Sequence, residues 1–284
     1  MSDLATSRGA LRGLRGYLGL LLAYLYAPLV ILVIFSFNDA VVPRFPLRGF
    51  TTRWYHQFLS NPELLASLRR SAVVAASSAA GAVALGLLAS VVLVRRRFRG
   101  RSAFAALVLS PLVIPYLVFG VSLLILLKTV DRFLIDAFGV FVGEGLHAVV
   151  VGHAVVSLPY AVLILVPRLE KISVSLEEAA LDLGANGWET FRRVTFPLLL
   201  PAVLSAYLVA VTISFDEVVI ASFLVGTETT YPVYLFSQIR FPTLLPQMLA
   251  VAVVVLVATL AVVVGAELGR RVAERRLDLP EARA

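Results

Sequence analysis

The chain contains no cysteine among its 284 residues, and it has only three histidines. Without cysteine it can form neither a disulfide framework nor a thiolate metal or redox site. Charged residues are also scarce, at 15%, whereas hydrophobic residues make up 60% of the chain. Soluble domains have about 25% charged residues and roughly 45–50% apolar ones. The shortage of charge therefore argues against an ordinary soluble globule.

Recognisable catalytic and nucleotide-binding patterns are missing as well. No GxxxxGK[ST] phosphate loop occurs, so the chain has no usual ATP site of its own. His56, His147 and His153 are scattered, and no Ser-His-Asp set or metal-ligand spacing accompanies them. His153 falls inside an apolar run, where we expect it to make an interhelical hydrogen bond rather than to bind a ligand. We therefore predict no catalytic residue, no metal site and no cofactor in this chain.

Long apolar runs are what the sequence does contain. Each run is close to the roughly 20 residues that a helix needs to cross a bilayer. The first is too long for a signal peptide and lacks a small-residue cleavage site, so we interpret it as a retained helix. We predict an all-α polytopic membrane protein with six transmembrane helices, at about 17–37, 71–94, 104–127, 146–167, 198–220 and 245–267.

The basic residues predict the orientation of these spans. With the N-terminus inside, 17 of the 25 Lys and Arg residues fall in inside segments. This excess favours two cytoplasmic termini. The predicted organisation is a basic segment (1–16), a membrane domain (17–267) with a cytoplasmic loop (168–197), and a cytoplasmic tail (268–284). The net charge of +7 is explained by anionic lipid headgroups at the bilayer surface, and we expect no nucleic-acid partner.

Two further features fall within and between the spans. The outer-loop stretch TTRWYHQFLS predicts an interfacial helix with Trp54 and Tyr55 at headgroup level. The third and fourth predicted spans contain helix-breaking residues, which either border a substrate cavity or reflect the general tolerance of membrane helices for them. These residues are Pro111, Pro115, Gly120 and Pro159.

A polar stretch, SLEEAALDLGANGWETFRRVTFPLLLP (175–201), interrupts the apolar pattern. Ser175 and Glu178 have the spacing of a capping box, which starts a helix. One apolar stripe follows, and Gly184 predicts a left-handed stop. Asn186 and Glu189 repeat the capping pattern, and Pro197 is expected to end the second short helix. The stripe consists of Leu176, Ala179, Ala180 and Leu183. So short a first helix is not stable alone, so its own membrane domain or a partner must hold it.

This stretch resembles the cytoplasmic EAA motif of ABC importer permeases. The segments LYAPLVILVIFSFNDA, SPLVIPYLVFGVSLLILL and ISFDEVVIASFLVG also look like the second permease of spermidine/putrescine-type importers. The resemblance implies a type I ABC importer permease fold and a coupling helix that enters a cleft of a separate ATPase. The residues implied in that coupling are Glu177, Glu178, Ala179, Ala180, Leu183, Gly184 and Pro201.

The same resemblance implies the partners. They are a second homologous permease, a dimer of cytoplasmic ATPase subunits that bind ATP and Mg²⁺, an external substrate-binding protein and the lipid bilayer of a bacterial inner membrane. The alternatives in substrate are an amino-acid derivative, thiamine or ferric iron. An ion-coupled carrier is a further alternative, but it would need buried ionisable residues in several spans.

Asp216 and Glu217 stand at the end of the fifth apolar run. A charged residue in a span is costly and is usually functional. Neighbouring residues on a helix point about 100° apart, so only one of the two is expected to face a pathway. A carboxylate there would attract a polyamine. The alternative is that the pair marks the watery end of the span without touching substrate.

Overall fold

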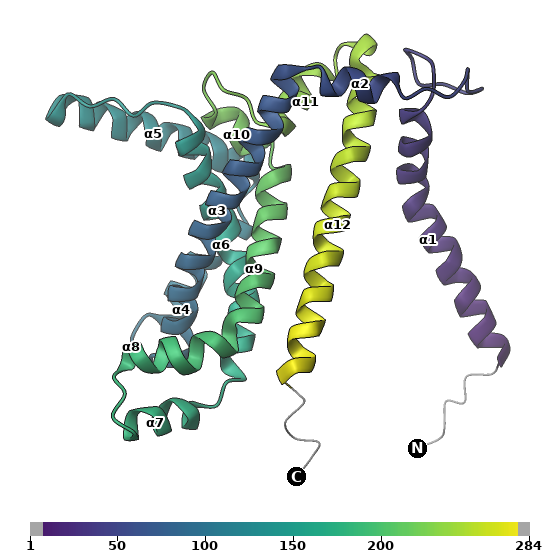
Figure 1. Cartoon of the computed structure of the whole chain (residues 1–284). Coiled ribbons are helices and arrows are strands. Elements are labelled where there is room, and N and C mark those ends of the chain that lie inside the picture. The colour runs from purple at the N-terminus through teal and green to yellow at the C-terminus, as the bar shows by residue number, and fades with distance from the viewer. Residues whose placement is uncertain (1–7, 278–284) are drawn as a thin grey trace. The chain divides into compact units, whose positions relative to one another are not determined.

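The computed structural model describes residues 8–277, and this part of the chain is helical without a named strand (Figure 1). The described residues divide into two compact units. One unit extends to Pro62 and resumes over Gln238–Gly265, and the other holds Glu63–Ser237. Five helices are long and apolar enough to cross a membrane, or six if one bent pair forms a single span.

The first unit contains two of these candidate spans, Gly13–Ser36 in α1 (Arg8–Ser36) and Pro242–Gly265 in η3 and α12 (Pro242–Leu244, Leu245–Leu277). The segment after α1 folds back on itself through an antiparallel bridge between Asn38 and Phe50. The predicted interfacial helix exists as α2 (Arg53–Leu59). Its Trp54 is only 4% exposed and donates a 2.9 Å hydrogen bond to the Asn38 carbonyl. The Trp54 indole therefore packs inside this loop, and the placement of Trp54 and Tyr55 at headgroup level stays a prediction.

The second unit begins with α3 and α6, which approach each other closely. A Cβ added to Gly86 of α3 would lie 2.9 Å from the Ala161 Cβ of α6, so this crossing requires glycine. Leu165, Leu199 and Ala206 complete a fully buried core that joins α6 to α9. The helices of the unit are α3 (Pro62–Arg95), α4 (Arg101–Leu109), η1 (Ser110–Leu112), α5 (Tyr116–Phe138), α6 (Leu146–Glu170), α7 (Val174–Asp182), α8 (Gly187–Thr190), η2 (Phe191–Thr195), α9 (Phe196–Asp216), α10 (Val219–Leu224) and α11 (Tyr231–Gln238).

The third predicted span is not one straight helix. The chain bends by 106° between Arg101–Leu112 and Tyr116–Phe138, and α5 projects to the left in Figure 1. Pro111 and Pro115 lie at this break, and Pro115 is the N-cap of α5 with an extended backbone. Proline removes a helix hydrogen bond and clashes with the preceding turn, which explains the break. The sequence marked these prolines as helix breakers, but it did not reveal how large the bend is.

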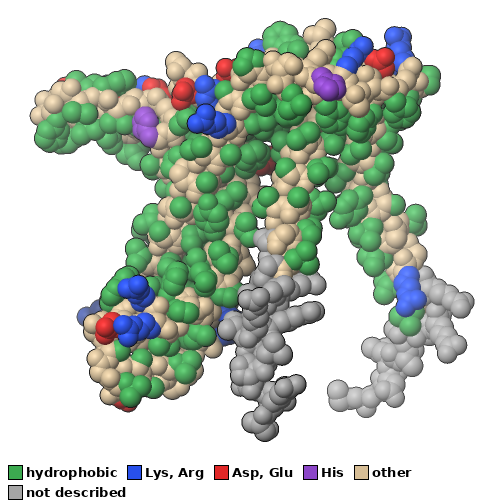
Figure 2. Space-filling model, in the orientation of Figure 1, with side chains coloured by type: hydrophobic (Ala, Val, Ile, Leu, Met, Phe, Trp, Pro, Cys, Tyr) green, Lys and Arg blue, Asp and Glu red, His purple; other side chains and the backbone are tan. Residues whose placement is uncertain are grey.

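The surface agrees with a membrane environment. Figure 2 shows hydrophobic side chains over the visible flanks of the long helices, with charged side chains gathered toward the helix ends. In the second unit, large apolar residues on α3 and α5 are exposed, such as Leu88 at 65% and Ile125 at 62%. In water this exposure would be costly, whereas lipid chains satisfy it.

Candidate coupling loop and acidic site

The loop that follows α6 (168–197, here called the coupling loop) folds as two short helices, at the bottom of Figure 1. The first, α7, starts two residues earlier than the predicted capping box. Ser173 is its N-cap and accepts a 3.3 Å hydrogen bond from the Ser175 amide. The prediction that Ser175 and Glu178 cap α7 is therefore wrong. Ser173 has the extended backbone of an N-cap, whereas Ser175 already lies inside the helix.

Gly184 ends α7 as the sequence predicted. Its φ is +91°, a left-handed conformation in which any side chain would be strained. The Ala185 amide donates to the Ala180 carbonyl at 3.1 Å, and the Gly184 amide donates to the Leu181 carbonyl at 2.9 Å. These two bonds form a Schellman motif. They turn the chain sharply between the two short helices.

The second helix is capped as predicted but ends differently. Asn186 Oδ1 accepts from the Glu189 amide at 2.9 Å, and Glu189 Oε2 accepts from the Asn186 amide at 3.1 Å. The helix then continues through the π-turn of η2 into α9, so that Gly187–Asp216 forms one 30-residue element. The expectation that Pro197 ends this helix is wrong. Pro197 lies directly after the π-turn of η2, where the hydrogen-bond pattern of the helix changes, and the helix continues past it.

The apolar stripe of α7 remains open. The structure buries no residue of α7. Leu176 is 48% exposed and Leu183 is 89% exposed, and Trp188 of α8 is 68% exposed. Exposed apolar side chains gathered on one surface usually mark an interaction site. Within the described residues, the loop thus presents an uncovered apolar surface, while Pro201 lies apart from it, inside α9 and partly buried.

The two adjacent glutamates of α7 have different environments. Glu177 forms an ion pair with Arg95 at the end of α3, at 3.1 Å, and the two side chains are 17% and 15% exposed. Arg95 Nε donates to both carboxylate oxygens of Glu177, and its Nη2 also donates to the Ile172 carbonyl. Thr195 of η2 adds a 2.9 Å hydrogen bond. Glu177 therefore connects α7 to α3 and to η2 within the coupling loop.

Glu178 is exposed, and the structure records no ion pair for it among the described residues. Of the two glutamates, it alone can offer its charge to a partner. The sequence did not reveal this division. Arg95 lies 82 residues from Glu177, and no local pattern connects the two.

At the other end of α9, the adjacent acids Asp216 and Glu217 also differ in their environments. The helix ends at Asp216, and Glu217 has an extended backbone. The Glu217 side chain is 4% exposed and lies 3.3 Å from His153 Nε2 of α6. It also accepts hydrogen bonds from the Val219 and Ala221 amides at 2.9 and 3.0 Å. Through these contacts, Glu217 connects α6, α9 and α10.

His153 continues this buried network. Its Nδ1 lies 2.8 Å from Ser214 Oγ, which accepts a 2.8 Å hydrogen bond from Ser78 of α3. The interhelical hydrogen bond expected for His153 is confirmed. The sequence did not predict that Glu217 pairs with His153. The only available signal was that Ser214 and Glu217 lie three residues apart, so that both could reach the same neighbour. The network joins four helices, α3, α6, α9 and α10, at one buried polar cluster.

Asp216 is exposed and lines an open pocket of about 400 Å³. Tyr116, Thr212 and the largely buried Glu217 are its other polar lining residues, and Ile213, Val218 and Val219 complete the lining. A carboxylate and a tyrosine at one open pocket suit a cationic group, which the carboxylate attracts and the ring face can stack against. Among the described residues, no group of three or more potential metal-ligating side chains exists.

Comparison with known proteins identifies the family to which this chain belongs. A family model described as "Binding-protein-dependent transport system inner membrane component" matches residues 82–278. The chain belongs to this family. The match covers most of the second unit, including α6, the coupling loop and α9. The chain is thus a multi-pass inner-membrane permease of the ABC importer class.

Two curated relatives match a large share of this chain. The putrescine transport system permease protein PotI of Escherichia coli (strain K12) is 38% identical over 219 residues, which cover 76% of each protein. The spermidine/putrescine transport system permease protein PotC of the same organism is 33% identical over 261 residues, covering 91% of this chain and 93% of the relative.

Solved structures support the fold. A bacterial ABC transporter that imports the acidic polysaccharide alginate gives a TM-score of 0.70 at 16% identity, covering 92% of this chain and 98% of that one. The MetNI methionine ABC transporter in an inward-facing conformation gives a TM-score of 0.58 at 18% identity, covering 74% and 95%. The type I importer fold predicted from the sequence agrees with both.

Proposed function

We propose that this permease carries polyamines, putrescine or spermidine, and that Asp216 rather than Glu217 attracts the cation. The single observation behind this choice is the opposite exposure of the two acids. Glu217 is buried, lies 3.3 Å from His153 Nε2, and already accepts hydrogen bonds from two backbone amides. Asp216 faces an open pocket beside Tyr116. The relatives PotI and PotC are named for putrescine and spermidine transport, which supports the same substrate class.

We further propose that a separate ATPase binds the coupling loop. The exposed side chains of Leu176, Leu183 and Trp188 would fill an apolar cleft of that partner, and Glu178 would pair with a basic residue beside it. ATP and Mg²⁺ would be bound by the ATPase dimer, because this sequence contains no phosphate loop. The loop would then lie in the cytoplasm together with both termini, as the distribution of basic residues predicts.

The transport cycle follows from these two sites. A second permease would complete the pathway, and an external binding protein would deliver the substrate. ATP binding would close the ATPase dimer and draw the two coupling loops together. The Arg95–Glu177 ion pair would pass that movement to α3, and the pathway would open outward. Hydrolysis would return it to the inward state, with Asp216 holding the cation during the change.

The test is ATP-driven uptake of labelled spermidine and putrescine into vesicles that contain the assembled complex. A hydrogen bond to a charged group contributes about 1.5–3 kcal/mol, so Asp216→Asn should lower the apparent affinity by roughly ten- to a hundredfold. Asp136→Asn is the matched control, because Asp136 is an exposed acid on α5 outside this pocket. Wild-type vesicles that concentrate neither polyamine would reject the substrate assignment. Normal uptake by Asp216→Asn would reject the role of Asp216.

The ion-coupled carrier remains the second candidate, favoured by one observation. His153 and Glu217 form a buried titratable pair of the kind that a proton relay uses. Uptake that persists after removal of the ATPase partner, and that stops when the proton gradient is dissipated, would support this alternative. Dependence on ATP alone would exclude it.

A further inference from the structure

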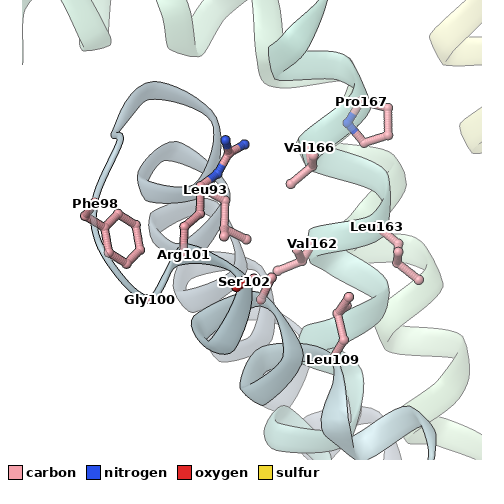
Figure 3. Close-up of a pocket in the computed structure, with 11 residues that line it drawn as sticks. Leu93, Phe98, Gly100, Arg101, Ser102, Leu109, Val162, Leu163, Val166 and Pro167 are labelled. Atoms are coloured by element: carbon pink, nitrogen blue, oxygen red, sulfur yellow. The ribbon is translucent and has the colours of Figure 1, made fainter.

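A groove lies between the α3–α4 corner and the end of α6 (Figure 3). Its volume is about 620 Å³, within the range of roughly 300–1,000 Å³ for small-molecule sites. Its walls are almost entirely apolar, with Leu93, Leu109, Val162 and Val166 among them. Nothing within the described residues fills it. The groove belongs neither to the coupling loop nor to the pocket at Asp216.

The rim of the groove is strongly basic. Arg101 lines it, and in Figure 3 its guanidinium extends along the opening between the 96–100 turn and α6. Arg96, Arg97 and Arg99 are exposed in the same corner. The structure records no ion pair for these four arginines within the part of the chain that it describes, whereas Arg95 is already held by Glu177. The sequence from 64 to 130 contains no Asp or Glu.

This charge imbalance identifies the occupant. An apolar groove alone would accept any hydrocarbon, but Arg101 on its lining and three further exposed arginines in the adjoining 96–99 segment favour an anionic group at this end. A long basic side chain near a span end places its stem along apolar surface and its charge at the headgroup level. We infer that the groove binds one anionic phospholipid, with an acyl chain against Leu93 and Val162 and the phosphate beside Arg99 and Arg101. The lipid would brace the α3–α4 corner next to the coupling loop.

Native mass spectrometry of the full-length chain in detergent tests this inference, with dioleoylphosphatidylglycerol and dioleoylphosphatidylcholine as probes. Each arginine near an anionic lipid surface contributes about fivefold to affinity. Wild type should therefore retain one phosphatidylglycerol in preference to phosphatidylcholine. Arg99→Gln/Arg101→Gln should weaken phosphatidylglycerol binding by roughly 25-fold and remove the preference. Leu163→Glu, on the exposed groove wall, should also weaken it.

The matched control is Arg44→Gln/Arg48→Gln, which removes the same charge from exposed positions in the other unit. This control should keep the single tightly held lipid. Equal binding of the two lipids by wild type would overturn the inference, and so would an equal loss in the control. A photoreactive residue at position 163 adds a second test in the assembled complex. Attachment to a lipid supports the site, whereas attachment to a second permease chain would show that the groove is a subunit interface.

Discussion

The coupling loop and the C-terminal end of α9 each carry two adjacent acidic residues. In both pairs, one acid is held by protein contacts and the other is exposed. In the loop, Glu177 is bound by Arg95 and Thr195, while Glu178 is exposed. At the end of α9, Glu217 is bound by His153 and two amides, while Asp216 is exposed. One acid of each pair therefore fixes the local structure, and its neighbour remains available to a partner or a substrate.

The two regions differ in how strongly the structural acid is held. The Glu217 side chain is 4% exposed, against 17% for Glu177. Removing a buried carboxylate leaves its hydrogen-bond donors with neither solvent nor a partner, which costs more than the same change near the surface. The comparison thus predicts a graded series of effects on stability, and it predicts that the exposed acids affect transport alone.

Glu217→Ala should have the largest effect. It leaves His153 without its carboxylate partner and frees the Val219 and Ala221 amides. Each buried polar group that is left unsatisfied costs about 1–3 kcal/mol, and this change leaves three. Thermal unfolding of the purified chain in detergent measures this loss, with Asp216→Ala as the neighbouring control. In a double-mutant cycle, His153→Ala/Glu217→Ala should cost less than the sum of the single changes. Strict additivity would contradict the pairing.

Glu177→Ala should have an intermediate effect confined to the coupling loop. It removes the bidentate contact with Arg95 and the Thr195 hydrogen bond. Hydrogen bonds to charged groups contribute about 1.5–3 kcal/mol. Limited proteolysis of the loop should become faster, and amide exchange across residues 174–195 should rise. The swapped pair Arg95→Glu/Glu177→Arg should recover part of the protection. If the loop of Glu177→Ala resists proteolysis and amide exchange as well as the wild-type loop does, the contacts of Glu177 with Arg95 and Thr195 do not hold the loop.

Gly184→Ala should have a smaller effect. The left-handed conformation at φ +91° costs a residue with a side chain about 1–2 kcal/mol. No atom lies within 4 Å of an added Cβ, so the cost is conformational and not steric. Asparagine tolerates this conformation better, so Gly184→Asn should be milder than Gly184→Ala. Amide exchange at Ala185 and Asn186 measures both, and equal protection in the two variants would contradict the explanation.

The sequence predicted the elements that local chemistry determines. Apolar run length predicted the spans, and residues within one helical turn of each other predicted the Gly184 stop and the Asn186–Glu189 box. The sequence-based prediction failed where distant residues, or two competing local patterns, determine the structure. Ser173 displaced Ser175 as the cap, and Pro111 with Pro115 bent the third span. The partners of Glu177 and Glu217 lie 82 and 64 residues away in the chain, so no pattern in one segment could reveal which acid is buried.

Glu178→Arg should change stability by no more than about 0.5 kcal/mol, because it alters an exposed side chain with no recorded partner among the described residues. Its expected effect is on function: ATP-driven uptake should be lost, because an arginine would face the basic residue proposed on the ATPase. Pull-down of the ATPase with the purified permease separates failed docking from failed transport. Glu178→Gln is the control, since it removes the charge without reversing it and should be less severe. Normal uptake by Glu178→Arg would overturn the proposed coupling through Glu178.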